Sequence, residues 1–368
     1  MNSRFMKIFN VIFLFLLLTG CANTQSVETG KEIKLKDSDK FKYIGLTDIF
    51  HDQQPVCLET NDNCLLKSIQ KIEVVDDFYY VLGGDTKTSV FVFDKTGHFI
   101  RKIGTQGHGK GEYLSAWDFT VDRENGRVAI LSAPSRVYLY HKDGSFIKTC
   151  SLGNAYCWNI TSMKNGFIGS TKHLTYTSGD DAFLLYFFDE DFKVRKKEIP
   201  VLPHQIYVPN FVSSVFIQDG EKKYYVDNFM NRIYDLAALD ADDNNYQISF
   251  SNPMPSEKFE TFETFSSSQR NFDFLKDVLL LGDKAIFVYI QNAQHCVETM
   301  NLSGKTIVQG CYSGNFPSMF SDGQGNVILC ISAYSFLKKK MEDFLPELKG
   351  KVKPGDNYIL VKCKLKDD

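Results

Sequence analysis

A glycine-rich stretch that carries a histidine and a lysine is the first candidate for chemistry. It reads GTQGHGKGE from Gly104 to Glu112, with His108 and Lys110 set between glycines. A phosphate-binding loop needs its glycines between a parallel strand and a helix, so that the helix N-terminus faces the anion. Here strand-like segments flank both sides, and no Lys-Ser or Lys-Thr pair follows. We therefore interpret the stretch as a connection between sheets whose glycines permit positive φ, with His108 and Lys110 as candidate ligand-binding residues.

Signatures of catalysis and metal binding are otherwise sparse. The chain has no G-x-S-x-G, H-E-x-x-H or EF-hand pattern. Its seven histidines are scattered along the sequence, at positions 51, 98, 108, 141, 173, 204 and 295. We expect no cofactor and no metal. A metal site assembled from single residues on separate elements would leave no motif, so a metal-assisted hydrolase or lyase stays open as the alternative.

The cysteines do not form a metal-binding pattern either. Eight of them follow Cys21, and no two have the C-x-x-C spacing of a zinc or redox site. In an exported protein, disulfides are possible. Cys57 with Cys64, and Cys150 with Cys157, are close enough in sequence to be candidate pairs, and scattered buried thiols are the other interpretation.

Composition restricts the class of partner. The formal charge is −3 and the lysines are dispersed, so the chain lacks the basic patch that nucleic-acid binding requires. We expect no nucleic-acid partner. Its 368 residues are enough for either two domains or one repeat structure.

A repeated hairpin favours one repeat structure over two domains. VFDKTGHFIRKIG at 92–104 is matched by LYHKDGSFIKTCS at 139–151, each a short strand, a turn built on Lys and Gly, and a second strand. Weaker copies follow, with steps between equivalent positions of 47, 48, 46, 66 and 63 residues. A repeated period of this size is typical of a propeller or solenoid.

A second marker gives the same count of repeats. A strand introduced by a polar turn precedes each of the six hairpins, and each unit begins with its own apolar strand, such as SAWDFTVDR. The sequence thus predicts an all-β fold, a six-bladed β-propeller of four-stranded antiparallel blades. The two long steps predict short helical insertions, and a strand within residues 41–60 is expected to pair with the last blade and close the ring.

The loops that join the second and third strands of each blade supply the remaining candidate ligand-binding residues. Those loops lie on the same face as the glycine-rich connection, where propeller ligands usually sit over the axis. Their candidates are Arg136, His173, Asn231 and Arg232. The alternative for each is a solvated loop residue or a hydrogen bond between blades. Tyr176 and Tyr207 are the aromatic residues that could stack on a glycan.

Residues 56–155 carry a family resemblance. Their elements are the FDxxGxFIRKIG hairpin, the GxGxGEY loop and the DFxVD strand that follows. This run resembles the six-bladed β-propeller lipoproteins of Bacteroides-type bacteria, relatives of the NHL-repeat propellers. The resemblance implies a propeller in the cell envelope and implies no particular activity.

The N-terminus has the order of a lipoprotein leader. Arg4 and Lys7 precede an apolar run at 11–18 that is too short to span a bilayer, and Cys21 follows a small-residue pair. By resemblance to the lipoprotein box, residues 1–20 are a signal peptide and Cys21 becomes the lipid anchor, which binds the membrane. Residues 21–40 are polar and predict a flexible tether, with the propeller at 41–368. Because Asp does not follow Cys21, we expect the outer membrane.

These observations favour a binding or scaffolding protein over an enzyme. The first hypothesis is an exported, lipid-anchored propeller whose loop face binds a protein or a glycan. Exposed aromatic side chains on that face would favour a glycan, whereas a flat apolar patch would favour a protein. The metal-assisted enzyme requires three or more ligand side chains that converge on the axis.

Overall fold

The structure of the protein is a computed structural model. The structure describes residues 30–37, 42–85, 87–132, 135–172, 183–201, 214–239 and 244–367. The expected leader at 1–20, the lipid-anchor residue Cys21 and the candidate residue His173 lie outside these ranges, as do Tyr176 and Tyr207. Among the described residues, no helix has the length and hydrophobicity to cross a membrane.

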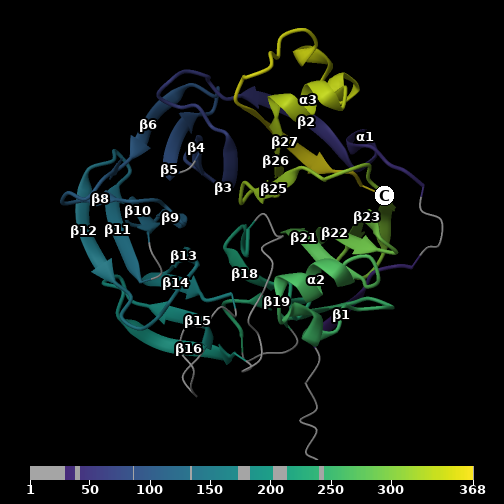
Figure 1. Ribbon diagram of the computed structural model, residues 1–368, viewed down its shortest axis with the longest axis horizontal. Coiled ribbons are helices and arrows are strands. Elements are labelled where there is room, and N and C mark those ends of the chain that lie inside the picture. The colour runs from purple at the N-terminus through teal and green to yellow at the C-terminus, as the bar shows by residue number, and fades with distance from the viewer. Residues whose placement is uncertain are drawn as a thin grey trace, which may run out of the picture.

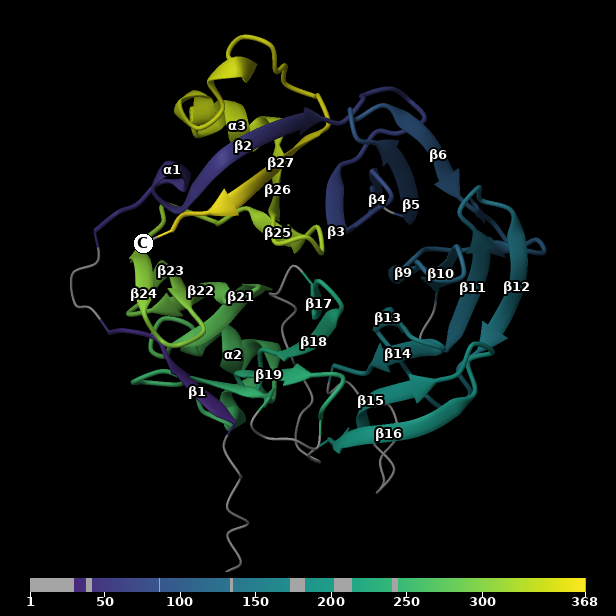
Figure 2. The ribbon, with the colours of Figure 1, turned by 180° about the vertical axis from the view of Figure 1, so that it is seen from behind.

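Six sheets are arranged in a ring around a central axis, as Figures 1 and 2 show, which confirms the predicted six-bladed propeller. The innermost strands of most neighbouring sheets contact one another. Blade 1 consists of β3 (Ser68–Val75), β4 (Phe78–Gly84), β5 (Thr88–Asp94) and β6 (Phe99–Ile103). Blade 2 consists of β9 (Asp118–Asp122), β10 (Arg127–Leu131), β11 (Arg136–His141) and β12 (Phe146–Ser151). Blade 3 consists of β13 (Asn159–Met163), β14 (Gly166–Ser170), β15 (Phe183–Phe188) and β16 (Val194–Pro200).

The second half of the chain repeats the pattern. Blade 4 consists of β17 (Phe216–Asp219), β18 (Lys222–Asp227), β19 (Arg232–Asp235) and β20 (Tyr246–Ser249). Blade 5 consists of β21 (Phe274–Leu281), β22 (Lys284–Gln291), β23 (Gln294–Asn301) and β24 (Thr306–Cys311). Blade 6 consists of β25 (Ser318–Ser321), β26 (Val327–Ser332), β27 (Tyr358–Leu365) and β2 (Phe50–Cys57).

Burial explains why the middle strands are apolar throughout while the outer strands are not. In β5, TSVFVFD, six of seven side chains are buried because neighbouring blades cover both faces. The outer strand β16, VRKKEIP, lies at the rim and has no buried residue. The hydrophobic core therefore consists of layers between adjacent blades, such as the one in which Tyr80 and Val92 of blade 1 pack with Phe119 of blade 2.

The ring is closed by the pairing of the two ends of the chain, as the sequence predicted. Strand β2, from the N-terminal part, is antiparallel to β27, with Val56 opposite Leu360 and His51 opposite Lys364. Closure gives blade 6 its fourth strand, and leaves no open edge between the first and last blades.

One N-terminal strand was not predicted. β1 (Lys31–Lys34) runs parallel to β20, with Ile33 opposite Ile248, and adds a fifth strand to blade 4. These residues fall in the segment 21–40 that we expected to be a flexible tether, so the ordered structure begins earlier than position 41. The side chains of Ile33 and Leu35 are buried, which accounts for the order of these residues among polar neighbours.

The helical insertions lie where the long repeat steps placed them. η2 (Ser256–Phe259) and α2 (Phe262–Ser268) join blades 4 and 5, while α3 (Ala333–Lys338), η3 (Met341–Asp343) and η4 (Pro346–Leu348) lie between β26 and β27. A single turn, α1 (Leu46–Ile49), precedes β2. Phe259 and Phe265 of this insertion are buried, whereas Phe262 is 63% exposed.

The glycine-rich connection between blades 1 and 2 folds on itself. Its short strands β7 (Thr105–Gln106) and β8 (Glu112–Tyr113) pair in parallel. A Cβ at Gly104, which has φ +68°, would lie 2.6 Å from the Tyr140 ring. The Gly109 N–H donates to the Glu112 carboxylate at 2.8 Å. A carboxylate of the chain itself thus occupies the position that an anion would take, in agreement with a connecting rather than a phosphate-binding role.

Candidate functional site

A pocket lies over one end of the central channel, where the inner strands of blades 1 to 3 begin. Its volume is about 360 Å³. The lining comes from the starts of β9 and β13, from β3 and from the loops beside them, and includes Lys71, Thr88, Ser115, Trp117, Asp118, Trp158, Asn159 and Lys172. This cavity, the tryptophan pocket, is on the face that the sequence predicted to bind ligands.

Two stacked indole rings form one wall of the tryptophan pocket. Trp117 and Trp158 are the only tryptophans in the chain, and each immediately precedes the inner strand of its blade. The backbone N–H of each residue donates at 2.7 Å to a carbonyl of the second strand, Leu131 for Trp117 and Ser170 for Trp158. The two side chains therefore occupy equivalent positions in neighbouring blades. Their ring centroids are 4.7 Å apart and the planes differ by 12°.

Two polar atoms beside this wall lack a hydrogen-bonding partner among the residues that the structure describes. They are the indole Nε1 of Trp158, a donor, and the Oδ1 of Asn159, an acceptor. A buried polar group without a partner costs about 1–3 kcal/mol. A ligand hydroxyl, which both donates and accepts, has the chemistry to satisfy groups of this kind.

Lys71 of β3 forms the floor of the tryptophan pocket and holds three blades together. Its ammonium donates to the carbonyl of Phe119 at 2.6 Å and to that of Ile160 at 3.2 Å. It also pairs with Asp118 at 3.1 Å and with Glu73 at 3.3 Å. Burial works to lower the pKa of Lys71, but the two carboxylates outweigh it and leave the pKa raised. The Lys71 ammonium is therefore charged at neutral pH.

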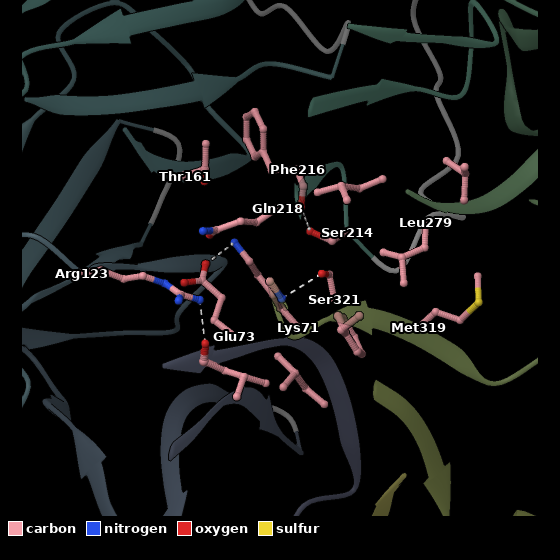
Figure 3. A pocket seen from close by; sticks show the side chains of 16 residues that line it. Lys71, Glu73, Arg123, Thr161, Ser214, Phe216, Gln218, Leu279, Met319 and Ser321 are labelled. Atoms are coloured by element: carbon pink, nitrogen blue, oxygen red, sulfur yellow. Dashed lines mark hydrogen bonds and ion pairs between the residues drawn. The ribbon is translucent and has the colours of Figure 1, made fainter. Parts of the chain in front are cut away.

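Below Lys71 the axis narrows to a small cavity of about 50 Å³, shown from close by in Figure 3. Inner strands of the surrounding blades contribute its lining, with Glu73 and Arg123 on one side and Ser321 and Met319 on another. Arg123 donates to the carbonyl of Val74 at 2.7 Å. The channel is thus filled by side chains, and the tryptophan pocket ends above it.

Lys172 brings a second ammonium to the lining of the tryptophan pocket. Burial lowers its pKa to about 8, an effect that Asp118 opposes and Lys71 reinforces. At neutral pH the side chain is still mostly protonated. The tryptophan pocket therefore combines an aromatic wall, two cations, the carboxylate of Asp118 and several hydroxyl and amide groups.

The described candidates from the sequence lie on the loop face but do not line the tryptophan pocket. His108 and Lys110 are exposed on the glycine-rich connection, and Arg136 is exposed at the start of β11. Asn231, with φ +51°, forms the turn between β18 and β19, and its carbonyl accepts from the Ile248 N–H at 2.8 Å. Arg232 stacks over Tyr234 at 5.3 Å. The structure does not bring these five residues together into one site.

The sequence contains a repeated motif that indicates the tryptophan pocket, although none of the candidate loop residues belongs to it. Trp117-Asp118-Phe119-Thr120 recurs as Trp158-Asn159-Ile160-Thr161. Both copies begin an inner strand, so a repeat-by-repeat comparison would have placed two indoles next to each other on the predicted face.

No metal centre accompanies these groups in the described part of the chain: no three His, Cys, Asp or Glu side chains lie close enough to share an ion.

Comparison with known proteins places the chain in a family. A family model described as a domain of unknown function, DUF4934, matches residues 31–364. The chain belongs to the DUF4934 family. The match begins at the first residue of β1, so the family's domain includes the strand that lies outside the predicted propeller. No curated protein matches this DUF4934 chain.

Solved structures show the same fold. A protein of Bacteroides fragilis that is thought to be exported has 17% identity and a TM-score of 0.71, and the match covers 92% of this chain and 100% of that one. A member of another family of unknown function, DUF4221, from Bacteroides vulgatus has 8% identity and a TM-score of 0.56, with 87% and 98% covered. At these identities the likeness extends to the fold alone.

Proposed function

We propose that this DUF4934 propeller is an exported, lipid-anchored binding protein that takes a saccharide into the tryptophan pocket. The observation that carries the proposal is the stacked pair Trp117 and Trp158 in the wall of a cavity of about 360 Å³. Ligand sites are typically concave, about 300–1,000 Å³ in volume, and combine aromatic surface with a few placed polar groups. The flat faces of sugar rings stack on indoles, and their hydroxyls pair with groups such as Asn159 and Asp118.

Concavity favours a glycan over a protein as the ligand. A protein partner would use a broad apolar surface, whereas this site is a pocket with polar and charged groups around one aromatic wall. The metal-assisted hydrolase has no observation in its favour.

A glycan array with the leaderless protein tests the ligand class. We expect binding to one group of related glycans, and a loss of about fivefold or more in affinity for Trp158→Ala, because stacking on an indole contributes roughly 1 kcal/mol or more. Phe262→Ala is the matched control, since it removes an aromatic side chain that is 63% exposed on α2 and does not line the pocket. An array without binding, or equal affinity for wild type and Trp158→Ala, would count against the proposal.

Export and anchoring rest on the leader and on a structural relative. Arg4, Lys7 and the apolar run precede Cys21, and the Bacteroides fragilis protein of the same fold is thought to be exported. The outer membrane is proposed because Ala22, not Asp, follows Cys21. Cys21→Ala is expected to move the protein from the membrane pellet to the soluble fraction on cell fractionation. If the variant stays in the pellet, Cys21 is not the anchor.

A further inference from the structure

Two buried cysteines face each other on neighbouring strands of blade 5. Cys296 lies on β23 and Cys311 is the last residue of β24, and the antiparallel register places them directly opposite. Both side chains are buried, and the two thiols are within hydrogen-bonding distance of each other. The Cys311 thiol also contacts the Gln294 side-chain oxygen, at 2.7 Å.

Backbone hydrogen bonds show which kind of antiparallel pair this is. The adjacent pair is hydrogen-bonded, because the Tyr312 N–H donates to the His295 carbonyl at 2.8 Å. Cys311 directs its own backbone groups away from β23: its N–H donates to the Lys42 carbonyl and its carbonyl accepts from the Ile44 N–H, both at 2.9 Å. Positions alternate along an antiparallel ladder, so Cys296 and Cys311 form a non-hydrogen-bonded pair.

Such a pair has the spacing that a disulfide needs. Opposite residues at a non-hydrogen-bonded position have Cα atoms about 4.5 Å apart, and disulfides span about 4.4–6.8 Å between Cα atoms. The cysteines that are close in sequence are arranged differently. The Cys64 thiol donates to the Glu59 carbonyl at 3.1 Å, and the described contacts of Cys57, Cys64, Cys150 and Cys157 do not join them to one another.

We propose that Cys296 and Cys311 form a cross-strand disulfide when the chain matures in an oxidising compartment. The oxidant is a disulfide, either a small molecule or a protein of the thiol–disulfide exchange class. One cysteine thiolate attacks it and releases the first thiol, leaving a mixed disulfide, and the other cysteine thiolate then attacks that bond and releases the second thiol. The protein loses two protons and two electrons, and the oxidant gains them.

Burial of the two thiols determines the stage of folding at which the disulfide can form. Desolvation raises the pKa of both thiols in the folded blade, and the thiolate is the reactive species. Exchange is therefore fast while blade 5 is still open and slow once it has packed. The disulfide would also hold Cys311 in place. Cys311 in turn holds the N-terminal segment, through one backbone hydrogen bond to Lys42 and one to Ile44.

Mass spectrometry of the wild-type protein is the deciding experiment. The full-length protein is isolated from its envelope fraction with N-ethylmaleimide present and no reductant, and is digested without reduction. We expect one linked peptide that contains Cys296 and Cys311 and that disappears on reduction. Recovery of both cysteines as alkylated thiols, or a link from either one to another cysteine, overturns the proposal.

Variants and stability give a second readout. Cys311→Ser is expected to remove the linked peptide, whereas Cys363→Ser, which changes another buried cysteine, should retain it. Reduction should lower the Tm of the wild type by several degrees, and should leave the Tm of Cys311→Ser unchanged. An equal response of the two proteins to reductant would contradict a stabilising disulfide.

Discussion

Among single residues, Lys71 makes contacts that span the first three blades. Its ammonium reaches backbone carbonyls of β9 and β13 from its own position on β3, and it pairs with two carboxylates. Asp118 is itself fixed by the Ile160 N–H at 2.8 Å and by the Asn159 side chain at 3.1 Å. The floor of the tryptophan pocket is therefore a connected polar network with little freedom to rearrange.

Replacement of Lys71 tests this network. Lys71→Met is expected to lower the free energy of unfolding by about 3–5 kcal/mol, because it leaves the buried carboxylate of Asp118 and the partly buried one of Glu73 without their cation. Lys67→Met is the matched control: Lys67 forms an ion pair with Asp85 at 2.6 Å, but both side chains are exposed, so the loss should be below about 1 kcal/mol. Urea denaturation measures both values. Similar losses for the two variants would mean that the buried network contributes nothing beyond a surface pair.

At the level of elements, β1 is a fifth strand that belongs to the core of blades 4 and 5. Leu35 is 0% exposed and Ile33 is 3% exposed. Beyond the strand, the Lys36 N–H donates to the buried Glu298 carboxylate at 3.2 Å, and Gln291 donates to Asp37 at 2.7 Å. The N-terminal segment thus makes contacts of the same kind as the interior strands.

Leu35→Ala should consequently behave as a core mutation. A buried leucine shortened to alanine costs about 2–5 kcal/mol, while Lys34→Ala, one position earlier and exposed, should change the free energy of unfolding by less than about 0.5 kcal/mol. The measurement is equilibrium unfolding in urea. Equal stability of the two variants would show that the segment is only loosely associated. A protein shortened to begin at residue 41 would lose β1 altogether.

Elements of the propeller differ in how strongly the sequence specifies them. Hairpins such as β5–β6 were predictable because each combines alternating strands with a glycine turn at a repeated spacing. Closure of the ring was expected from a strand within residues 41–60, ahead of the first full blade. β1 was not predictable from its residues, because KEIKL has only two apolar side chains and its order depends on packing against residues of blades 4 and 5 that are distant in sequence. The short helices were predicted, but the exposure of Phe262 depends on the direction in which α2 docks.

For the molecule as a whole, the location of the site follows from ring geometry. Loop topology led us to expect a ligand over the axis on one face, and the tryptophan pocket lies on that face. The residues of the pocket were not predicted, because Trp117 and Trp158 meet only when adjacent blades are set side by side; the candidates were charged loop residues such as His108 and Arg136. The same geometry explains the cysteines, since sequence spacing suggested Cys57 with Cys64, while the register brings Cys296 to Cys311.

The ring also restricts how the protein would sit at a membrane. Under the proposed lipid anchor, nine residues lie between Cys21 and Lys31, the first residue of β1, so ten residue-to-residue steps join them. A chain of that length reaches at most roughly 35 Å. The outer edge of blade 4, where β1 pairs, would then be the part of the ring held nearest to the bilayer.

Tryptophan fluorescence provides the most direct test of the tryptophan pocket as a saccharide site. The chain has two tryptophans and both line this pocket, so its intrinsic emission reports on the site without any label. Mono- and disaccharides are titrated one at a time, with calorimetry in parallel. The account predicts a saturable change in emission whose midpoint equals the calorimetric Kd. Calorimetric binding without a change in emission, or no binding by any saccharide, would contradict it.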